Sequence, residues 1–136
     1  MKKEAEQIII NLLQEKLDPF IIYLFGSTVK GRARQDSDID IAFVKNEEPP
    51  IEKYDLFLIA QELASWLNQD VDLIDLYQSS TVFQAQVVHT GEIIYCSDEQ
   101  QKAQFEMKAF KMYTQLNEER APILKEVSER GTIYEK

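Results

Sequence analysis

The stretch FIIYLFGSTVKGRARQDSDIDIAFV, residues 20–44, decides the fold. Its first six residues are all apolar and rich in strand formers, which is typical of a central strand that is covered on both faces. Gly26 ends that run. From Asp38 to Val44 acidic and apolar residues alternate, and a period of two indicates a second strand. We therefore expect two strands joined by a polar connection.

Asp38 and Asp40 are the first candidate functional residues. Side chains two positions apart on a strand lie on the same face, so these carboxylates project together, with their Cα atoms roughly 7 Å apart. Carboxylate oxygens suit Mg²⁺, which is normally bound by one or two carboxylates together with substrate phosphates. The pair therefore predicts a metal site and, with it, a nucleotide.

Gly26 and Ser27 follow the first strand and are the candidate phosphate contact. A strand that turns into a helix start leaves backbone N–H groups free to face a phosphate, and the Ser27 hydroxyl adds one donor. Taken singly, a turn glycine, an N-cap serine and an Asp-x-Asp pair all have purely structural explanations. Their combination at this spacing favours catalysis.

A third carboxylate is needed to complete a two-metal site, and residues 71–76 (VDLIDL), read as a strand, offer Asp72 and Asp75. Because the two residues differ by an odd number, they point to opposite faces of the strand. Only one of them can join the site. Geometry alone does not choose between them.

Periodicity along the rest of the chain predicts an α/β (α+β) fold: a mixed sheet of about four strands flanked by helices, with a C-terminal helix. Phe57, Trp66, Phe83 and Phe105 are most simply explained as core aromatics. Pro122 is expected to interrupt or end the last helix near Arg120. The expected elements are helices near 2–17, 56–67, 80–91 and 98–120 and strands near 20–25, 38–44, 71–76 and 92–96.

Composition narrows the function further. The chain has 136 residues, with 24 acidic and 15 basic side chains and a formal net charge of −9. Such an acidic chain is a poor general partner for nucleic-acid phosphates, so we expect no direct nucleic-acid binding. The single cysteine, Cys96, cannot form an internal disulfide, which fits the cytoplasm. We find no apolar run that could span a bilayer and expect no membrane partner.

The pattern Gly-Ser, ten residues, Asp-x-Asp, then Val-Asp-Leu-Ile-Asp resembles the minimal nucleotidyltransferases of the polymerase-β-like superfamily. The resemblance covers roughly residues 1–97, which would form the minimal nucleotidyltransferase domain. Residues 98–136 would then be a C-terminal helix and tail, a candidate partner-binding extension.

The resemblance also assigns roles to individual residues. It implies that the metal-binding and catalytic set is Asp38, Asp40 and Asp72, holding two Mg²⁺ ions, and it is the only ground for preferring Asp72 over Asp75. Gly26 and Ser27 would bind the triphosphate of ATP. Lys30 and Arg34 fall where family members often carry basic residues, and Arg32 lies between them without an assigned role. Thr28 departs from the pattern, because many members carry arginine there.

Members this short are commonly paired with a small helical HEPN-type protein. The chain is similar to the antitoxin of such HEPN/MNT pairs, in which AMP passes from ATP to a tyrosine hydroxyl of the HEPN-type toxin, an RNase. This resemblance implies an Mg²⁺-dependent protein adenylyltransferase whose partner is its cognate toxin, in a hetero-oligomer. The alternatives are an antitoxin that neutralises its partner by occlusion alone, and a nucleotidyltransferase that acts on a small molecule.

Overall fold

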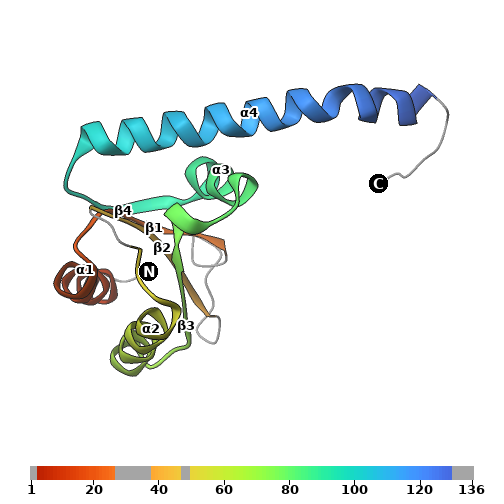
Figure 1. Ribbon diagram of the computed structural model, residues 1–136. Coiled ribbons are helices and arrows are strands. Elements are labelled where there is room, and N and C mark those ends of the chain that lie inside the picture. Colours follow the sequence, from red (N-terminus) through yellow and green to blue (C-terminus); the bar gives the residue numbers. More distant parts are fainter. Residues whose placement is uncertain (1–2, 27–37, 47–49, 130–136) are drawn as a thin grey trace.

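The computed structural model describes residues 3–26, 38–46 and 50–129, with the side chains of 118–129 left out (Figure 1). One short 3₁₀ helix, η2, follows the third strand. The elements are α1 (Lys3–Leu17), β1 (Pro19–Leu24), β2 (Ile39–Lys45), α2 (Lys53–Leu67), β3 (Val71–Asp75), η2 (Leu76–Gln78), α3 (Thr81–Thr90), β4 (Glu92–Cys96) and α4 (Glu99–Glu129).

The four described strands form one mixed sheet in the order β3-β2-β1-β4. β1 is antiparallel to both of its neighbours, β2 and β4, whereas β2 and β3 are parallel. Every residue of β1 is buried, as its unbroken apolar run predicts. The expected four-stranded mixed sheet with flanking helices is confirmed.

Helices cover both faces of the sheet, so the core has two layers. On one face the strand side chains Ile22, Leu24, Ile41 and Phe43 pack with buried residues of α1 and α2. On the other face the alternate residues, such as Tyr23 and Ala42, pack with side chains from α3 and α4. Figure 1 shows this division, with α1 and α2 on one side of the sheet and α3 and α4 on the other.

Local chemistry sets several helix ends close to the limits expected for the helices near 56–67 and 80–91. Asn68 ends α2 in the left-handed conformation, with φ 57°. The Ser80 hydroxyl caps α3 by accepting a hydrogen bond from the Phe83 N–H at 3.1 Å. The backbone N–H of Gly91 donates to the Val87 carbonyl and closes the last turn of α3.

Two expectations outside the sheet are wrong. Phe57 and Trp66 are 55% and 65% exposed, because the buried side of α2 is formed by Ile59, Ala60 and Leu63. Helix α4 also continues past Pro122 to Glu129. Proline costs a helix one backbone hydrogen bond, but its fixed φ is close to the helical value, so the helix can continue.

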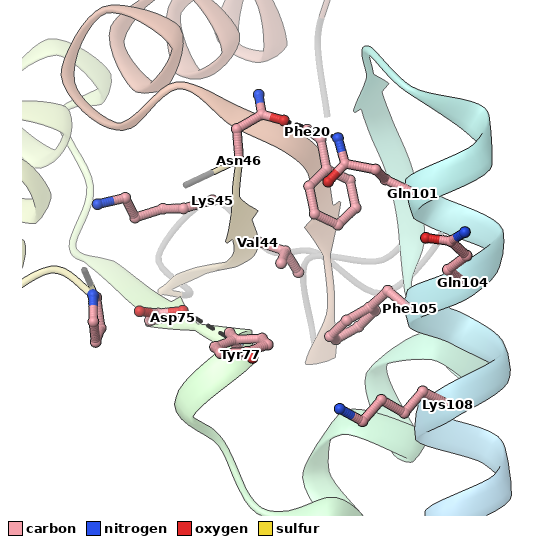
Figure 2. A pocket seen from close by; sticks show the side chains of 11 residues that line it. Phe20, Val44, Lys45, Asn46, Asp75, Tyr77, Gln101, Gln104, Phe105 and Lys108 are labelled. Atoms are coloured by element: carbon pink, nitrogen blue, oxygen red, sulfur yellow. Dashed lines mark hydrogen bonds between the residues drawn. The ribbon is translucent and has the colours of Figure 1, made fainter. Parts of the chain in front are cut away.

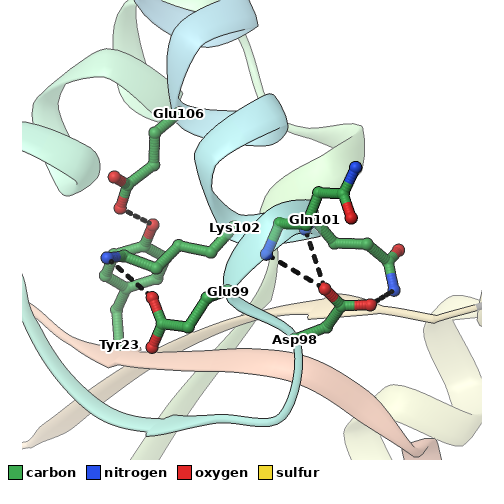
Figure 3. A network of polar contacts seen from close by, with 7 residues as sticks. Tyr23, Asp98, Glu99, Gln101, Lys102 and Glu106 are labelled. Carbon is green, nitrogen blue, oxygen red and sulfur yellow. Dashed lines mark hydrogen bonds and ion pairs between the residues drawn. The ribbon is translucent and has the colours of Figure 1, made fainter.

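The C-terminal helix is tied to the sheet by polar and apolar contacts. The Tyr23 hydroxyl donates to Glu106 Oε2 at 2.7 Å (Figure 3). Ala109 of α4 is 2% exposed. At the start of α4 the Asp98 carboxylate accepts from the backbone N–H groups of Gln100 and Gln101. Within the described ranges, no helix combines the length and apolarity that crossing a membrane requires.

Candidate functional site

Asp40 and Asp72 are partners in the parallel register of β2 and β3. Two residues further along these strands, Ala42 and Ile74 belong to the apolar cluster under α3 and α4. Because side chains two apart share a face, both carboxylates lie on the α3 and α4 face of the sheet, near the starts of their strands. Asp38 is exposed and lies directly before β2.

Gly26 brings the end of β1 against Asp40. Its φ is +61°, and a Cβ built on it would lie 2.5 Å from Asp40 Oδ2. The preceding residue, Phe25, donates its backbone N–H to the Asp40 carbonyl at 3.1 Å. The left-handed φ favours glycine, and a Cβ here would push the end of the Asp40 side chain away from the turn.

The remaining predicted phosphate-binding residues fall outside the described part of the chain. These are Ser27, Lys30 and Arg34, together with Arg32 and the departing residue Thr28. The described candidate site therefore consists of Gly26, Asp38, Asp40 and Asp72.

Asp75 lies at the opposite end of β3 from Asp72 and is 7% exposed. Its Oδ1 accepts the backbone N–H of Tyr77 at 3.2 Å, and its Oδ2 accepts Gln78 Nε2 at 2.7 Å. The Ser79 hydroxyl donates to the Asp75 carbonyl at 3.1 Å. Asp75 thus caps η2 and shapes the connection to α3.

A cavity of about 290 Å³ lies beside Asp75, between the sheet and α4 (Figure 2). Phe20 and Val44 line it from the sheet, and Phe105 lines it from α4. Val44 stands near the end of β2, whereas Asp40 stands near its start. The cavity and the Asp40–Asp72 pair are therefore at different ends of the sheet.

Sequence reasoning missed the capping role of Asp75. An aspartate whose carboxylate accepts the N–H two residues later is a common turn element, and the polar residues at 78–80, shortly after Asp75, are the signal that could have found it. The contact between Phe25 and Phe83 was also missed: their ring centroids are 5.4 Å apart at 88°. No short-range sequence pattern predicts the contact between Phe25 and Phe83.

Carboxylates are the donors that Mg²⁺ takes, and Asp40 and Asp72 supply them from adjacent strands beside a turn with no room for a Cβ. Among the residues that the structure describes, no three His, Cys, Asp or Glu side chains are gathered as a ready metal cage. The donor set fits an ion that is held by few carboxylates and completed by substrate phosphates.

Comparison with known proteins gives a consistent result. Residues 7–100 match the family described as polymerase beta, nucleotidyltransferase. The chain is 38% identical over 128 residues to the protein adenylyltransferase MntA of Shewanella oneidensis, a match that covers 93% of this chain and 90% of the relative.

Solved structures are also similar to this chain over most of its length. One is a tri-AMPylated Shewanella oneidensis HEPN toxin in complex with MNT antitoxin; it is 36% identical, with a TM-score of 0.77, and the match covers 94% of this chain and 99% of the other. Another is a toxin-antitoxin with AMP-PNP; it is 38% identical, with a TM-score of 0.80, and the match covers 90% of this chain and 98% of the other.

Proposed function

The chain belongs to the polymerase beta-type nucleotidyltransferase family, and from that premise we propose that it is the antitoxin of a HEPN/MNT pair. In this proposal it transfers AMP from ATP to a tyrosine hydroxyl of its cognate HEPN-type toxin and thereby neutralises the toxin. The similarity to MntA and to the AMPylated toxin complex supports the reaction and the partner. The cytoplasm is the proposed compartment, because the reaction consumes ATP.

The observation that carries the proposal is the register of Asp40 opposite Asp72, with Gly26 against the Asp40 carboxylate. Two carboxylates on neighbouring strands beside a glycine turn suit a nucleotide whose phosphates enter at the turn. A side chain at 26 would displace the Asp40 carboxylate, so glycine at this position leaves that carboxylate in place beside the end of β1.

The chemistry is a displacement at phosphorus. The toxin tyrosine oxygen attacks the α-phosphorus of ATP, the new O–P bond forms, and the bond from the α-phosphorus to the bridging oxygen breaks as pyrophosphate leaves. The hydroxyl proton passes to a carboxylate, and Asp72 is the proposed acceptor. Ion-pairing side chains near the phosphates lower the barrier, because this class of transfer depends on electrostatic stabilisation.

Asp38, Asp40 and Asp72 are the proposed ligands of two Mg²⁺ ions. When bound, Mg²⁺ supplies Lewis acidity at the phosphate oxygens. Gly26, Ser27, Lys30 and Arg34 are the proposed contacts of the triphosphate. In this arrangement Asp38 and Asp40 would bind the ions at the start of β2, and Asp72 would bind them from β3.

The test combines purified protein, Mg²⁺, ATP and the purified cognate toxin, and reads the intact mass of the toxin. We expect the mass to rise by whole AMP units. Asp38→Ala combined with Asp40→Ala should abolish the rise, and Asp55→Ala, an exposed acid on α2, should leave it unchanged. An unmodified toxin with the unsubstituted protein overturns the proposal.

Neutralisation in cells separates catalysis from occlusion. If the double-alanine protein still rescues growth from the toxin, the chain acts by binding alone. We expect no rescue, because the proposed neutralisation requires the transferred AMP.

A further inference from the structure

We infer that Phe83 of α3 is a positioning residue, which acts through Phe25 to fix the Gly26 turn against Asp40. The inference rests on the proposed function for its catalytic consequence, but its structural part stands on the described contacts alone. It extends the candidate site to α3, a helix to which no catalytic role has been given.

The first contact is between the two aromatic rings. The centroids of Phe25 and Phe83 are 5.4 Å apart, and the rings are almost perpendicular, at 88°. This edge-to-face arrangement is favourable because the positive edge of one ring meets the negative face of the other. Both rings are half-buried and pack against the cluster on the α3 and α4 face.

The second contact links Phe25 to the acid. Phe25 follows the last residue of β1, and its N–H donates to the Asp40 carbonyl at 3.1 Å. Gly26 is joined to Phe25 by one peptide bond, and a Cβ at 26 would lie 2.5 Å from Asp40 Oδ2. With so little clearance, a shift of Phe25 moves Gly26 relative to the Asp40 carboxylate.

The third set of contacts holds Phe83 itself. Its N–H donates to the Ser80 hydroxyl at 3.1 Å, so its backbone is fixed at the capped start of α3. Gln84 Nε2 donates to the Leu76 carbonyl at 2.9 Å and secures the preceding connection. Val87, one turn later, is 1% exposed and anchors the helix to the sheet. Phe83 is therefore held in place, and the Phe25 ring packs against it.

The test compares two variants that remove the same atoms from the same cluster. Phe83→Leu removes the ring that contacts Phe25. Phe105→Leu is the matched control, since Phe105 is also half-buried against this cluster but lines the cavity at the other end of the sheet. Phe83→Tyr retains the ring and serves as the conservative variant. If Phe83→Leu does not fold, Phe83→Met replaces it.

The first readout does not depend on activity. Hydrogen exchange of the Phe25 N–H, followed by ¹⁵N-resolved NMR, reports its bond to the Asp40 carbonyl. We expect Phe83→Leu to speed this exchange about tenfold, in line with the loss of one aromatic pair. Phe105→Leu and Phe83→Tyr should leave it within about twofold.

The second readout is AMP transfer to the toxin. We expect kcat/KM to fall by about tenfold to a hundredfold in Phe83→Leu, because small misplacements of reacting groups cost that much. Phe105→Leu, at similar thermal stability, should retain its rate.

Equal exchange at Phe25 in Phe83→Leu and Phe105→Leu overturns the inference, and so does a Phe83→Leu protein with unchanged exchange. If the unsubstituted protein transfers no AMP, the proposed function fails, but the exchange comparison still decides whether Phe83 positions the turn.

Discussion

Tyr23, the next-to-last residue of β1, donates its phenolic hydrogen to Glu106 Oε2 on α4 across 2.7 Å, and the two residues are 83 positions apart in the chain. Tyr23 is 0% exposed, and its bond to Glu106 is part-buried. Figure 3 shows the hydroxyl directed at the Glu106 carboxylate. It crosses the boundary between residues 1–97 and 98–136 that the family resemblance suggests. The first turns of α4 therefore pack against the sheet and cover part of it.

Tyr23→Phe removes only the hydroxyl. We expect the free energy of unfolding at neutral pH to fall by about 1–2 kcal/mol, because a part-buried hydrogen bond to a carboxylate is lost. Tyr95→Phe is the matched control: its hydroxyl accepts Gln14 Nε2 at an exposed site, and we expect a loss of less than about 0.5 kcal/mol. Urea unfolding measures both. Equal losses in the two variants would contradict the buried role of Tyr23.

The Tyr23 hydroxyl should also make the free energy of unfolding fall at alkaline pH. Burial, and then the hydrogen bond and charge of Glu106, raise the pKa of Tyr23 above its ordinary value. The bond's contribution is complete below the unfolded pKa of about 10 and declines as pH rises from there toward the folded pKa. Above about pH 10, unfolding free energy should drop by up to about 1.4 kcal/mol per pH unit more in the wild type than in Tyr23→Phe. Parallel pH curves from the two proteins would refute this.

Gly26→Ala should damage activity more than stability. The new Cβ meets the mobile end of Asp40, so the carboxylate turns away, and the left-handed φ adds a cost of about 1–2 kcal/mol. We expect a folded protein whose AMP transfer is reduced about a hundredfold. Rates from toxin mass spectra and unfolding curves are compared on the same samples.

Gly91→Ala is the contrasting control. There a Cβ would lie 2.5 Å from the Val87 carbonyl and 3.2 Å from the Leu24 carbonyl, both backbone atoms that cannot turn aside. We expect a loss of about 1–3 kcal/mol in unfolding free energy. At a temperature where the variant stays folded, AMP transfer should be nearly normal. A Gly26→Ala protein that keeps full activity would show that Gly26 does not position the Asp40 carboxylate for AMP transfer.

Local patterns were sufficient to locate the strands and several helix ends. The six apolar residues at 20–25 correspond to β1, because a strand that is covered on both faces is apolar throughout. The alternation at 38–44 located β2, although β2 is also buried on both faces from Ile41 to Val44. Asn68 acts through its left-handed backbone and Ser80 through a hydroxyl that caps its own helix, so both positions can be predicted from local sequence. Phe57 and Trp66 are different, since residue type alone does not say which side of α2 meets the sheet.

The candidate site needed information that no short pattern holds. A period of two placed Asp72 and Asp75 on opposite faces, but it could not say which strand lies beside theirs or in what register. The pairing of β2 with β3 brings Asp72 opposite Asp40, and that is a tertiary property. The contact of Phe25 with Phe83 likewise joins segments that are distant in the chain.

The two acids of β3 can be separated by one pair of variants. Asp72 is exposed, so Asp72→Ala should leave the free energy of unfolding within about 0.5 kcal/mol of the wild type. If Asp72 accepts the tyrosine proton and holds Mg²⁺, AMP transfer should fall by about a hundredfold or more.

Asp75→Ala should behave in the opposite way. It leaves the Tyr77 N–H and the Gln78 amide without their acceptor at a buried position, which should cost about 1–3 kcal/mol of unfolding free energy. Below its unfolding temperature this variant should transfer AMP within a few-fold of the wild-type rate, because Asp75 lies at the end of β3 away from Asp40. An inactive but stable Asp75→Ala protein, beside an active Asp72→Ala protein, would assign the third carboxylate to Asp75 and would require the start of β3 to be excluded from the site.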